Sequence, residues 1–314
     1  MSALQVFTVS SGDDGLRLDL FLARVMPGIS RRAAGRLIGE GAVLVDGVTA
    51  DKGLRLQSGH SVSVPDQHDL GQGVIPDPEM AIEILHLDAD VVVVNKPAGI
   101  HTHPLDASER GTLAGFLVAK FPETASVGHS SLEPGVLHRL DQGTSGVVLA
   151  ARNSAAFEEL KKQFKSGRVT KTYFAVVQGE TPDTGSIQMP LKKSGPRGEK
   201  VVVVKQGEAA RIHPQPAVTN FWTFGHRAGC SLCEIVIPTG VRHQIRVHMA
   251  AIGHPLVNDA LYGSALPVPG LEPGRHLLHA WKIAFDHPVT GERIIVESQM
   301  PEDMKRFWEK PVMA

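Results

Sequence analysis

The residues best suited to chemistry lie in one polar loop, HRLDQGTSG, at positions 138–146. This loop places the charges of Arg139 and Asp141 two residues apart, directly before the apolar run that ends in VVLAA. Because a buried strand fixes the side chains at its end, such a loop can hold a carboxylate for nucleophilic or acid–base work. A surface turn with an incidental ion pair would contain the same residue types, and these types alone do not separate the two interpretations.

The stretch PTGVRHQIRVHMAAIGHP, at positions 238–255, predicts a turn followed by a helix over 242–252. Arg242 and Arg246 are four residues apart and therefore share one face of that helix. An arginine on such a face can act as the counter-charge of a buried carboxylate and favour its ionised form.

Neither the histidines nor the cysteines predict a metal site. His243 and His248 are five residues apart, which separates them by about 140° around a helix, whereas two ligands four residues apart lie closer together. Cys230 and Cys233 fall in an alternating strand, so their sulfurs point to opposite faces and indicate core packing. The sequence also has no GxxxxGK[ST] loop and no dinucleotide-binding glycine pattern, so we expect no cofactor.

The first segment predicts a small α/β domain that could bind RNA. Ser30 is expected to cap its second helix and Gly41 to end it. Arg31, Arg32 and Arg36 lie near one face of that helix, which suits a phosphate backbone but would equally suit an ordinary surface helix. The predicted elements are helices over 16–25 and 31–40 and strands over 43–45 and 61–64.

The rest of the chain predicts an α+β domain that positions the polar loop. Residues 66–80 are acidic and rich in glycine and proline, so we expect domains over 1–65 and 81–314 with a linker over 66–80. Strands come in adjacent pairs with helices between them, which favours a mixed, largely antiparallel sheet over a doubly wound one. We predict strands over 82–87, 91–95, 146–151, 171–177, 221–224, 230–237, 277–285 and 294–298, and helices over 112–121, 154–166 (capped by Ser154 and ended by Gly167) and 242–252.

Charge is segregated along the chain although its formal net charge is only −1. Residues 16–64 carry seven basic and four acidic groups, and residues 160–211 carry eleven and four, whereas residues 66–90 carry seven acids and no lysine or arginine. Such a distribution can hold a polyanion on one face, although solvated charged faces would show the same pattern.

Composition indicates an ordinary globular protein. The chain is 42% hydrophobic and 21% charged. No apolar run approaches the roughly 18 residues that span a bilayer, and the start MSALQVFTVSSGDDG lacks the features of a signal peptide. With only two cysteines, we expect a cytoplasmic protein with no membrane partner.

Taken together, these stretches resemble the RluA-type family of pseudouridine synthases, and the first segment resembles the alpha-L RNA-binding motif. The resemblance implies the pseudouridine synthase fold, an isomerase that needs no cofactor, and an RNA partner. Large-subunit ribosomal RNA is the expected substrate, transfer RNA is the alternative, and a monomer is expected. The motifs that carry the resemblance are, in order, LDADVVVVNKPAGIHTHP, HRLDQGTSG, KTYFAVVQG, PTGVRHQIRVHMAAIGHPLVNDALYG and LLHAWKIAFDHPVTGE.

The resemblance also assigns roles to individual residues. It implies that Asp141 is the nucleophile and that Arg246 pairs with this carboxylate. It implies that Tyr173 packs on the target base and is a candidate for proton transfer at C5, although a lone tyrosine on a strand is more often a core residue. Arg139 is expected to enter the gap left by the flipped base, at a cost of roughly a few kcal/mol for extruding that base. The full set of expected substrate contacts is Arg139, Arg242, His138 and Thr144.

The sequence departs from the family pattern in two places. Val241 stands where the family usually has an arginine, and Arg242 follows it, so either Arg242 takes over that role or a phosphate contact is lost. Gln142 and Gly143 stand where a charged pair is more usual, which affects the charge of the loop. Two alternatives from other classes stay open, a non-catalytic RNA-binding protein and a metal-dependent hydrolase.

Overall fold

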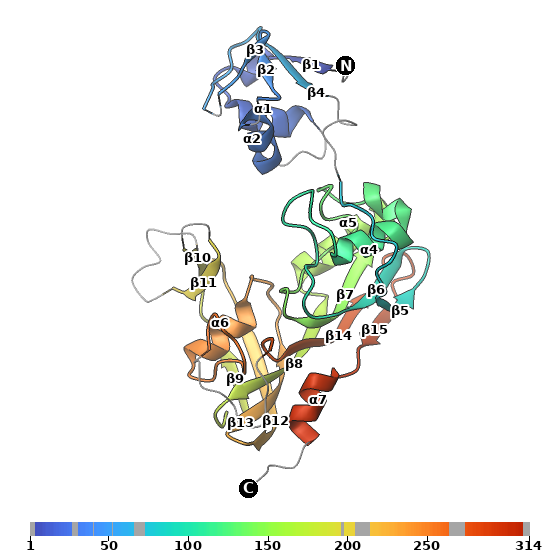
Figure 1. Cartoon of the computed structure of the whole chain (residues 1–314), viewed down its shortest axis with the longest axis vertical. Helices are drawn as coiled ribbons and strands as arrows, with labels where there is room; N and C mark the ends of the chain where they lie inside the picture. The colour runs from blue at the N-terminus through green and yellow to red at the C-terminus, as the bar shows by residue number, and fades with distance from the viewer. Residues whose placement is uncertain are drawn as a thin grey trace.

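The computed structural model describes residues 4–26, 31–39, 41–51, 53–65, 73–195, 198–204, 214–263 and 274–309. Figure 1 shows a small N-terminal domain at one end of the molecule and a larger domain that carries the remaining elements. Ser30, the expected cap of the second helix, lies outside the described residues, as do the side chains of Arg32 and Arg36.

The N-terminal domain packs two helices against a four-stranded sheet in the order β1-β4-β2-β3. Leu18, Leu22 and Phe21 occupy one face of the first helix and are almost fully buried, because residues three and four apart lie on the same side of a helix. Its elements are β1 (Leu4–Thr8), η1 (Ser11–Asp13), α1 (Leu18–Val25), α2 (Arg31–Gly39), β2 (Leu44–Val45), β3 (Val48–Thr49) and β4 (Ser61–Pro65).

The larger domain is built on a nine-stranded sheet in the order β5-β6-β7-β14-β8-β13-β12-β9, with β15 paired to β14. Among the strands of the described residues, β7 and β14 alone pair in parallel. The predicted α+β fold with a mixed, largely antiparallel sheet is therefore confirmed. The strands are β5 (Glu83–Leu87), β6 (Val91–Lys96), β7 (Ser145–Ala151), β8 (Thr170–Gln178), β9 (Thr184–Ile187), β12 (Thr219–Arg227), β13 (Cys230–Val236), β14 (Leu278–Asp286) and β15 (Arg293–Glu297).

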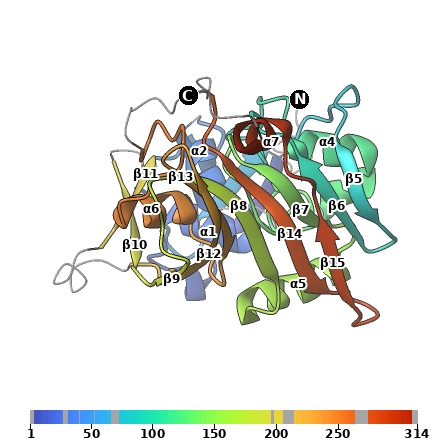
Figure 2. The ribbon, with the colours of Figure 1, turned by 90° about the horizontal axis from the view of Figure 1, so that it is seen from below.

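Helices cover both faces of this sheet (Figure 2). Tyr173, Ala175 and Val177 of β8 contribute to the main core, whereas Phe174 and Val176 pack with the C-terminal helix on the opposite face. A separate hairpin of β10 (Leu191–Ser194) and β11 (Lys200–Val203) lies beside the sheet. The helices are α4 (Leu113–Lys120), η2 (Pro122–Ser126), α5 (Ser154–Ser166), α6 (Gln244–Ala251) and α7 (Glu302–Glu309).

A close approach of two backbones explains Gly146 in the polar loop. Gly146 has φ of 116° and lies where β7 meets β14, opposite Ala280. A Cβ atom at this position would lie 2.1 Å from the Ala280 carbonyl oxygen, so glycine is required there.

Several predicted boundaries are wrong by one or more residues. Asn153, and not Ser154, caps α5, because its side chain accepts the N–H of Ala156. Gly167 ends that helix in the left-handed conformation, as predicted. The predicted helix over 242–252 begins only at Gln244, since His243 has a left-handed φ of 57°.

The described part of the predicted linker, residues 73–80, is hydrogen bonded to the larger domain. The Val74 N–H donates to the Ser131 carbonyl, and the Asp77 N–H donates to the Gly115 carbonyl.

Among the described elements, no helix has the length and apolar character needed to cross a membrane.

Candidate active site

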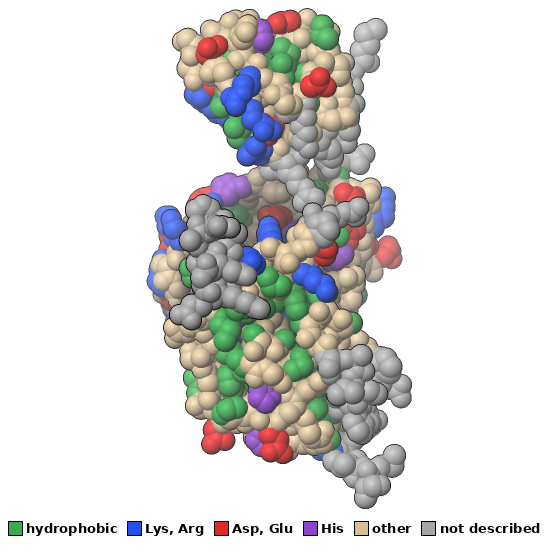
Figure 3. Space-filling model, turned by 90° about the vertical axis from the view of Figure 1, so that its left-hand side faces the viewer, with side chains coloured by type: hydrophobic (Ala, Val, Ile, Leu, Met, Phe, Trp, Pro, Cys, Tyr) green, Lys and Arg blue, Asp and Glu red, His purple; other side chains and the backbone are tan. Residues whose placement is uncertain are grey.

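A pocket of about 730 Å³ brings the polar loop together with β8, α5 and the start of α6. Asp141 is the one acidic side chain among the described residues that line it. On the face drawn in Figure 3, lysine and arginine side chains lie on the lower part of the N-terminal domain and around the upper part of the larger domain. The basic residues that line the pocket are Arg139, Lys161, Lys165, Lys171, Arg242 and Arg246.

Asp141 is held by a buried arginine. The Arg246 Nη1 donates to the Asp141 carboxylate at 2.9 Å, and the side chains of Asp141 and Arg246 are 17% and 9% exposed. The Nε and Nη2 of Arg246 donate to the two oxygens of Asp259 at 2.7 and 2.8 Å. This bidentate pair fixes the plane of the guanidinium and directs its remaining edge at Asp141.

Asp259 is an anionic anchor for that arginine. Burial would raise the pKa of Asp259, but the hydrogen bonds and positive charge of Arg246 outweigh burial and lower it. The N–H groups of Leu261 and Tyr262 also donate to this carboxylate. Asp259 therefore stays ionised. Because it accepts from Nε and Nη2 of Arg246, the Nη1 group is the one that donates to a second carboxylate, Asp141.

Tyr173 lies on β8, opposite Ile235 and Ala280 in the neighbouring strands, and lines the same pocket. The residue is 6% exposed. Burial, together with the negative charge of Asp141, raises its pKa above the usual range. Tyr173 is therefore a neutral phenol at neutral pH, with a flat ring beside the carboxylate.

The other loop residues are positioned by distant segments. Exposed Arg139 donates from Nη1 to the Nε2 of His103 at 3.0 Å. Buried Thr144 hydrogen bonds through Oγ1 to the Nε2 of His276 at 2.8 Å. The structure thus brings Arg139 and Thr144 to the pocket with Asp141, as the sequence predicts.

His138 forms part of the pocket wall. Its Nε2 accepts the N–H of Leu149 at 3.0 Å, and its ring lies 5.3 Å from that of Phe164. Burial, with a contribution from the charge of Lys171, lowers the pKa of His138 to about 3. The imidazole is therefore neutral and is committed to the backbone of β7.

Gly143 fits tightly against His276. A Cβ atom at position 143 would lie 2.8 Å from the Cε1 of His276, which is closer than carbon atoms normally approach. Any other residue at this position would therefore force the ring of His276, which orients Thr144, to shift.

Lys96 is a site residue that sequence reasoning missed. It ends the apolar run VVVVNK and is fully buried, and its Nζ donates to the carbonyls of Pro97, Ile100 and Gln142 at 2.8, 2.9 and 3.3 Å. Burial lowers its pKa to about 7, with Arg275 adding to this effect and Asp141 opposing it. A lysine that ends a buried strand is the signal that could have identified it.

The described residues contain one group with metal-ligand chemistry, Asp88, Asp90 and His287. The His287 Nδ1 accepts the N–H groups of Val289 and Thr290, so the ring proton lies on Nε2. That nitrogen is 3.3 Å from the Asp88 carboxylate. Hydrogen bonding within the cluster therefore accounts for its arrangement.

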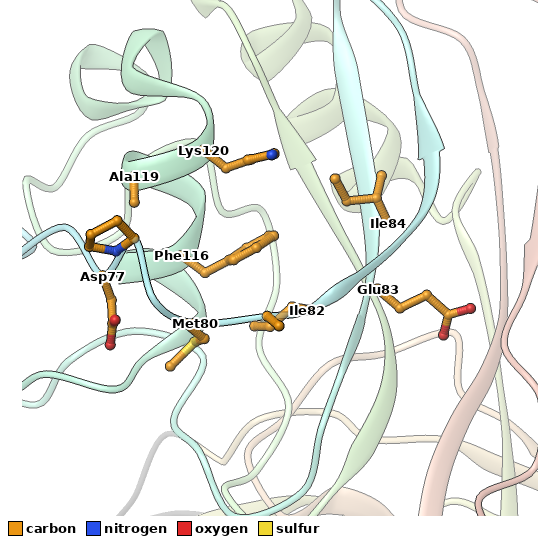
Figure 4. A pocket seen from close by; sticks show the side chains of 10 residues that line it. Asp77, Met80, Ile82, Glu83, Ile84, Phe116, Ala119 and Lys120 are labelled. Atoms are coloured by element: carbon orange, nitrogen blue, oxygen red, sulfur yellow. The ribbon is translucent and has the colours of Figure 1, made fainter.

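A second pocket, of about 590 Å³, lies between α4 and residues 77–84 (Figure 4). Phe116 of α4 faces Ile82 across it, and Lys120 extends toward the strand that carries Ile84. None of the predicted catalytic residues is among the described residues that line this pocket.

Comparisons with known proteins identify the family of the chain. The family model described as RNA pseudouridylate synthase matches residues 90–251, and the S4 domain model matches residues 16–62. The uncharacterized RNA pseudouridine synthase YlyB of Bacillus subtilis is 34% identical over 96% of both chains. The ribosomal large subunit pseudouridine synthase D of Neisseria meningitidis serogroup B is 34% identical over 92% of this chain and 77% of its own.

Solved structures show the same architecture. The human RNA pseudouridylate synthase domain containing 1 has a TM-score of 0.56 and 28% identity, and the match covers 71% of this chain and 84% of that chain. The resemblance to RluA-type enzymes is therefore confirmed. This chain belongs to the RNA pseudouridylate synthase family and carries an S4 domain at its N-terminal end.

Proposed function

We propose that the protein converts specific uridines of large-subunit ribosomal RNA to pseudouridine, with Asp141 as the nucleophile. The observation that carries this proposal is the Asp141–Arg246–Asp259 chain of ion pairs in a basic pocket beside Tyr173. Relatives from Neisseria meningitidis and Pseudomonas aeruginosa are both named ribosomal large subunit pseudouridine synthase D, and this supports the choice of RNA.

The reaction requires few chemical groups. It breaks the bond between ribose C1′ and uracil N1, joins C1′ to C5, removes a proton from C5 and adds one to N1. A carboxylate can attack the sugar or the base, or assist the departure of uracil, and each route uses Asp141 in its ionised form. Arg246 presents that carboxylate in one orientation, which lowers the entropy cost of attack.

Tyr173 supports the rotating base. Its raised pKa keeps the phenol neutral, so the ring offers a stacking surface and one hydrogen-bond donor. Acceptance of the C5 proton would require the phenolate form, which burial disfavours. We therefore assign Tyr173 to base stacking in preference to proton transfer.

The surrounding cations serve the polyanionic substrate. Arg139 is exposed at the pocket and is suited to fill the gap left by an extruded uridine. Lys161 and Lys165 on α5 extend the basic lining, and Arg31 adds an exposed cation on the S4 domain. We further propose that the protein acts as a monomer in the cytoplasm, and the ribosomal names of its bacterial relatives support the second part of this proposal.

The test is pseudouridine mapping across all RNA from strains with and without the gene, followed by complementation with wild type or Asp141→Asn. We expect specific large-subunit sites to vanish on deletion and to return with wild type. Asp141→Asn, which is nearly isosteric, should restore less than about a thousandth of the rate.

The outcomes separate the parts of the proposal. Full restoration by Asp141→Asn would refute the nucleophile. Loss of sites only in transfer RNA would replace the substrate while retaining the reaction. No lost site in any RNA, with RNA binding intact, would identify a non-catalytic RNA-binding protein.

A further inference from the structure

The hairpin of β10 and β11 is hydrogen bonded to two side chains, Arg242 just before α6 and Tyr262 in the segment that follows this helix. The Nη1 and Nη2 of Arg242 donate to the carbonyls of Gly198 and Glu199 at 3.1 and 2.8 Å. The hydroxyl of Tyr262 accepts the N–H of Val201 at 2.9 Å. These three bonds reach backbone atoms just before β11 and at its second residue, so they hold this end of the hairpin in place.

A small apolar cluster supports the same junction. Val241, which stands where the family usually has an arginine, packs in this cluster and immediately precedes Arg242. The two positions thus act together, since one side chain packs beneath the hairpin and the next hydrogen bonds to it. The members are Leu191, Val201, Ala217 and Val247, with Val203, Val241 and Tyr262 packed against them.

The junction continues to the catalytic ion pair. The Nε of Arg242 donates to the Nε2 of His243 at 3.2 Å, so the His243 ring proton lies on Nδ1, which is 2.7 Å from the Tyr262 hydroxyl. The Tyr262 ring lies 5.1 Å from the guanidinium of Arg246, which holds Asp141. Burial lowers the pKa of His243 to about 4, which is consistent with a neutral ring in this chain of contacts.

We propose that Arg242 is a positioning residue that couples the β10–β11 hairpin to the Asp141–Arg246 pair, and that it does not act mainly as a phosphate contact. The inference rests on the proposed function. Nitrogens Nε, Nη1 and Nη2 of Arg242 each donate to a protein acceptor, and the side chain spans from the hairpin to His243. In place of the usual arginine, this chain therefore has Val241, which packs in the apolar cluster, and then Arg242, which hydrogen bonds to the hairpin.

The first test compares Arg242→Ala with Lys165→Ala, which removes an exposed cation of the same pocket. Binding to an unmodified transcript of large-subunit ribosomal RNA is measured as a function of salt concentration. Lys165→Ala should reduce the slope of log affinity against log salt by about one, as expected for a lost phosphate contact. Arg242→Ala should leave that slope unchanged while kcat falls roughly 10- to 100-fold and KM changes little.

The opposite pattern would overturn the proposal. If Arg242→Ala reduces the salt slope as much as Lys165→Ala does and leaves kcat unchanged, the arginine is a phosphate contact. Equal unfolding midpoints for both variants and wild type, measured in urea, ensure that the comparison concerns folded protein.

The second test needs no RNA. Hydrogen exchange of the amides in residues 198–203 should accelerate in Arg242→Ala and remain at the wild-type rate in Lys165→Ala, with the amides of β6 as internal reference. Unchanged exchange in Arg242→Ala refutes the tie. This readout is independent of pseudouridine formation, so a wild-type protein without activity would refute the proposed function and leave the inference to be decided by exchange.

Discussion

Each domain contains a buried aspartate that binds arginine, but the two sites present their arginines to different surroundings. In the S4 domain, the Asp19 side chain is 5% exposed and binds Arg17 and Arg31, which are 38% and 56% exposed. In the catalytic domain, the Asp259 side chain is fully buried and binds Arg246, which is 9% exposed. The carboxylates are alike, and the exposure of the cation is what differs.

The exposure of the arginine separates two uses of an aspartate–arginine ion pair. An arginine at the surface keeps N–H groups for phosphates and contributes only about 0–1 kcal/mol to stability through its ion pair. A buried arginine is desolvated, so it must satisfy its charge within the protein, and here it does so with a second carboxylate, Asp141. Exposure therefore indicates whether an aspartate-bound arginine serves a polyanion or a reacting group.

The largest expected effect comes from breaking the buried pair. Asp259→Asn leaves the Arg246 charge with less compensation, and Arg246→Met leaves Asp259 as an unpaired buried charge. Each should lower the free energy of unfolding by about 3–5 kcal/mol in urea titrations. The bidentate contact with Asp259 makes Arg246 a structural as well as a site residue.

The double variant, Asp259→Asn with Arg246→Met, provides the control. It should recover part of the lost stability, because neither charge is then left buried alone, yet it should not recover turnover. Additive losses of stability in the double variant would show that the two side chains do not act as a pair.

An intermediate effect is expected from pH, because the catalytic domain buries neutral histidines. Burial lowers the pKa of His138 to about 3 and the pKa values of His243, His276 and His279 to about 4. The unfolded chain takes up protons near pH 6.5 while the folded chain does not, so stability should fall as pH drops below 6.5. Each histidine contributes about 1.4 kcal/mol per pH unit at most.

Tryptophan fluorescence during urea unfolding between pH 7.5 and 5 measures this slope. It reports on the catalytic domain, because all three tryptophans, Trp222, Trp281 and Trp308, lie there. A free energy of unfolding that is constant from pH 6.5 to pH 5 would show that these histidines become protonated without unfolding.

The smallest effect is expected at the surface pair. Arg31→Ala should change the free energy of unfolding by less than about 1 kcal/mol. It should weaken RNA binding and reduce the salt slope by about one, since Arg31 is exposed on the S4 domain. Arg293→Ala on β15, which removes another exposed arginine in an ion pair, is the matched control and should leave the slope unchanged. Equal slopes for the two variants would place Arg31 outside the RNA interface.

Much of the fold could be predicted from periodicity and turn residues. The pairing of β5 with β6 and the end of α5 at Gly167 follow from local sequence. The strands β9, β10 and β11 were not predicted, because each is only four residues long. In addition, β9 pairs with β12, which lies far away in the sequence, and the segment that joins β10 to β11 has a mixed composition. Helix α7 was also missed, since its apolar residues face a cluster on the back of the sheet that only tertiary structure creates.

The residues of the site also divide into those that the sequence predicts and those that it does not. Asp141, Tyr173 and Arg246 were predicted as a group, and the structure brings them into one pocket, while their roles remain predictions. Asp259 and Lys96 were missed because their functions arise from partners on other elements, 13 residues away in the case of Arg246 and 46 in the case of Gln142. A sequence motif indicates reactive groups more readily than the buried charges that orient them.

The fit between Gly143 and His276 couples the choice of side chain at two positions that lie far apart in the sequence. A relative with a charged side chain at the position of Gly143 needs a different partner at the position of His276, because the imidazole would meet the new Cβ at 2.8 Å. A side chain at position 143 alone would push the His276 ring away, and loss of His276 alone would remove the hydrogen bond that orients Thr144, whereas we expect a joint exchange to be tolerated better. Transplanting the family's usual loop into this enzyme would accordingly succeed only as a two-site graft.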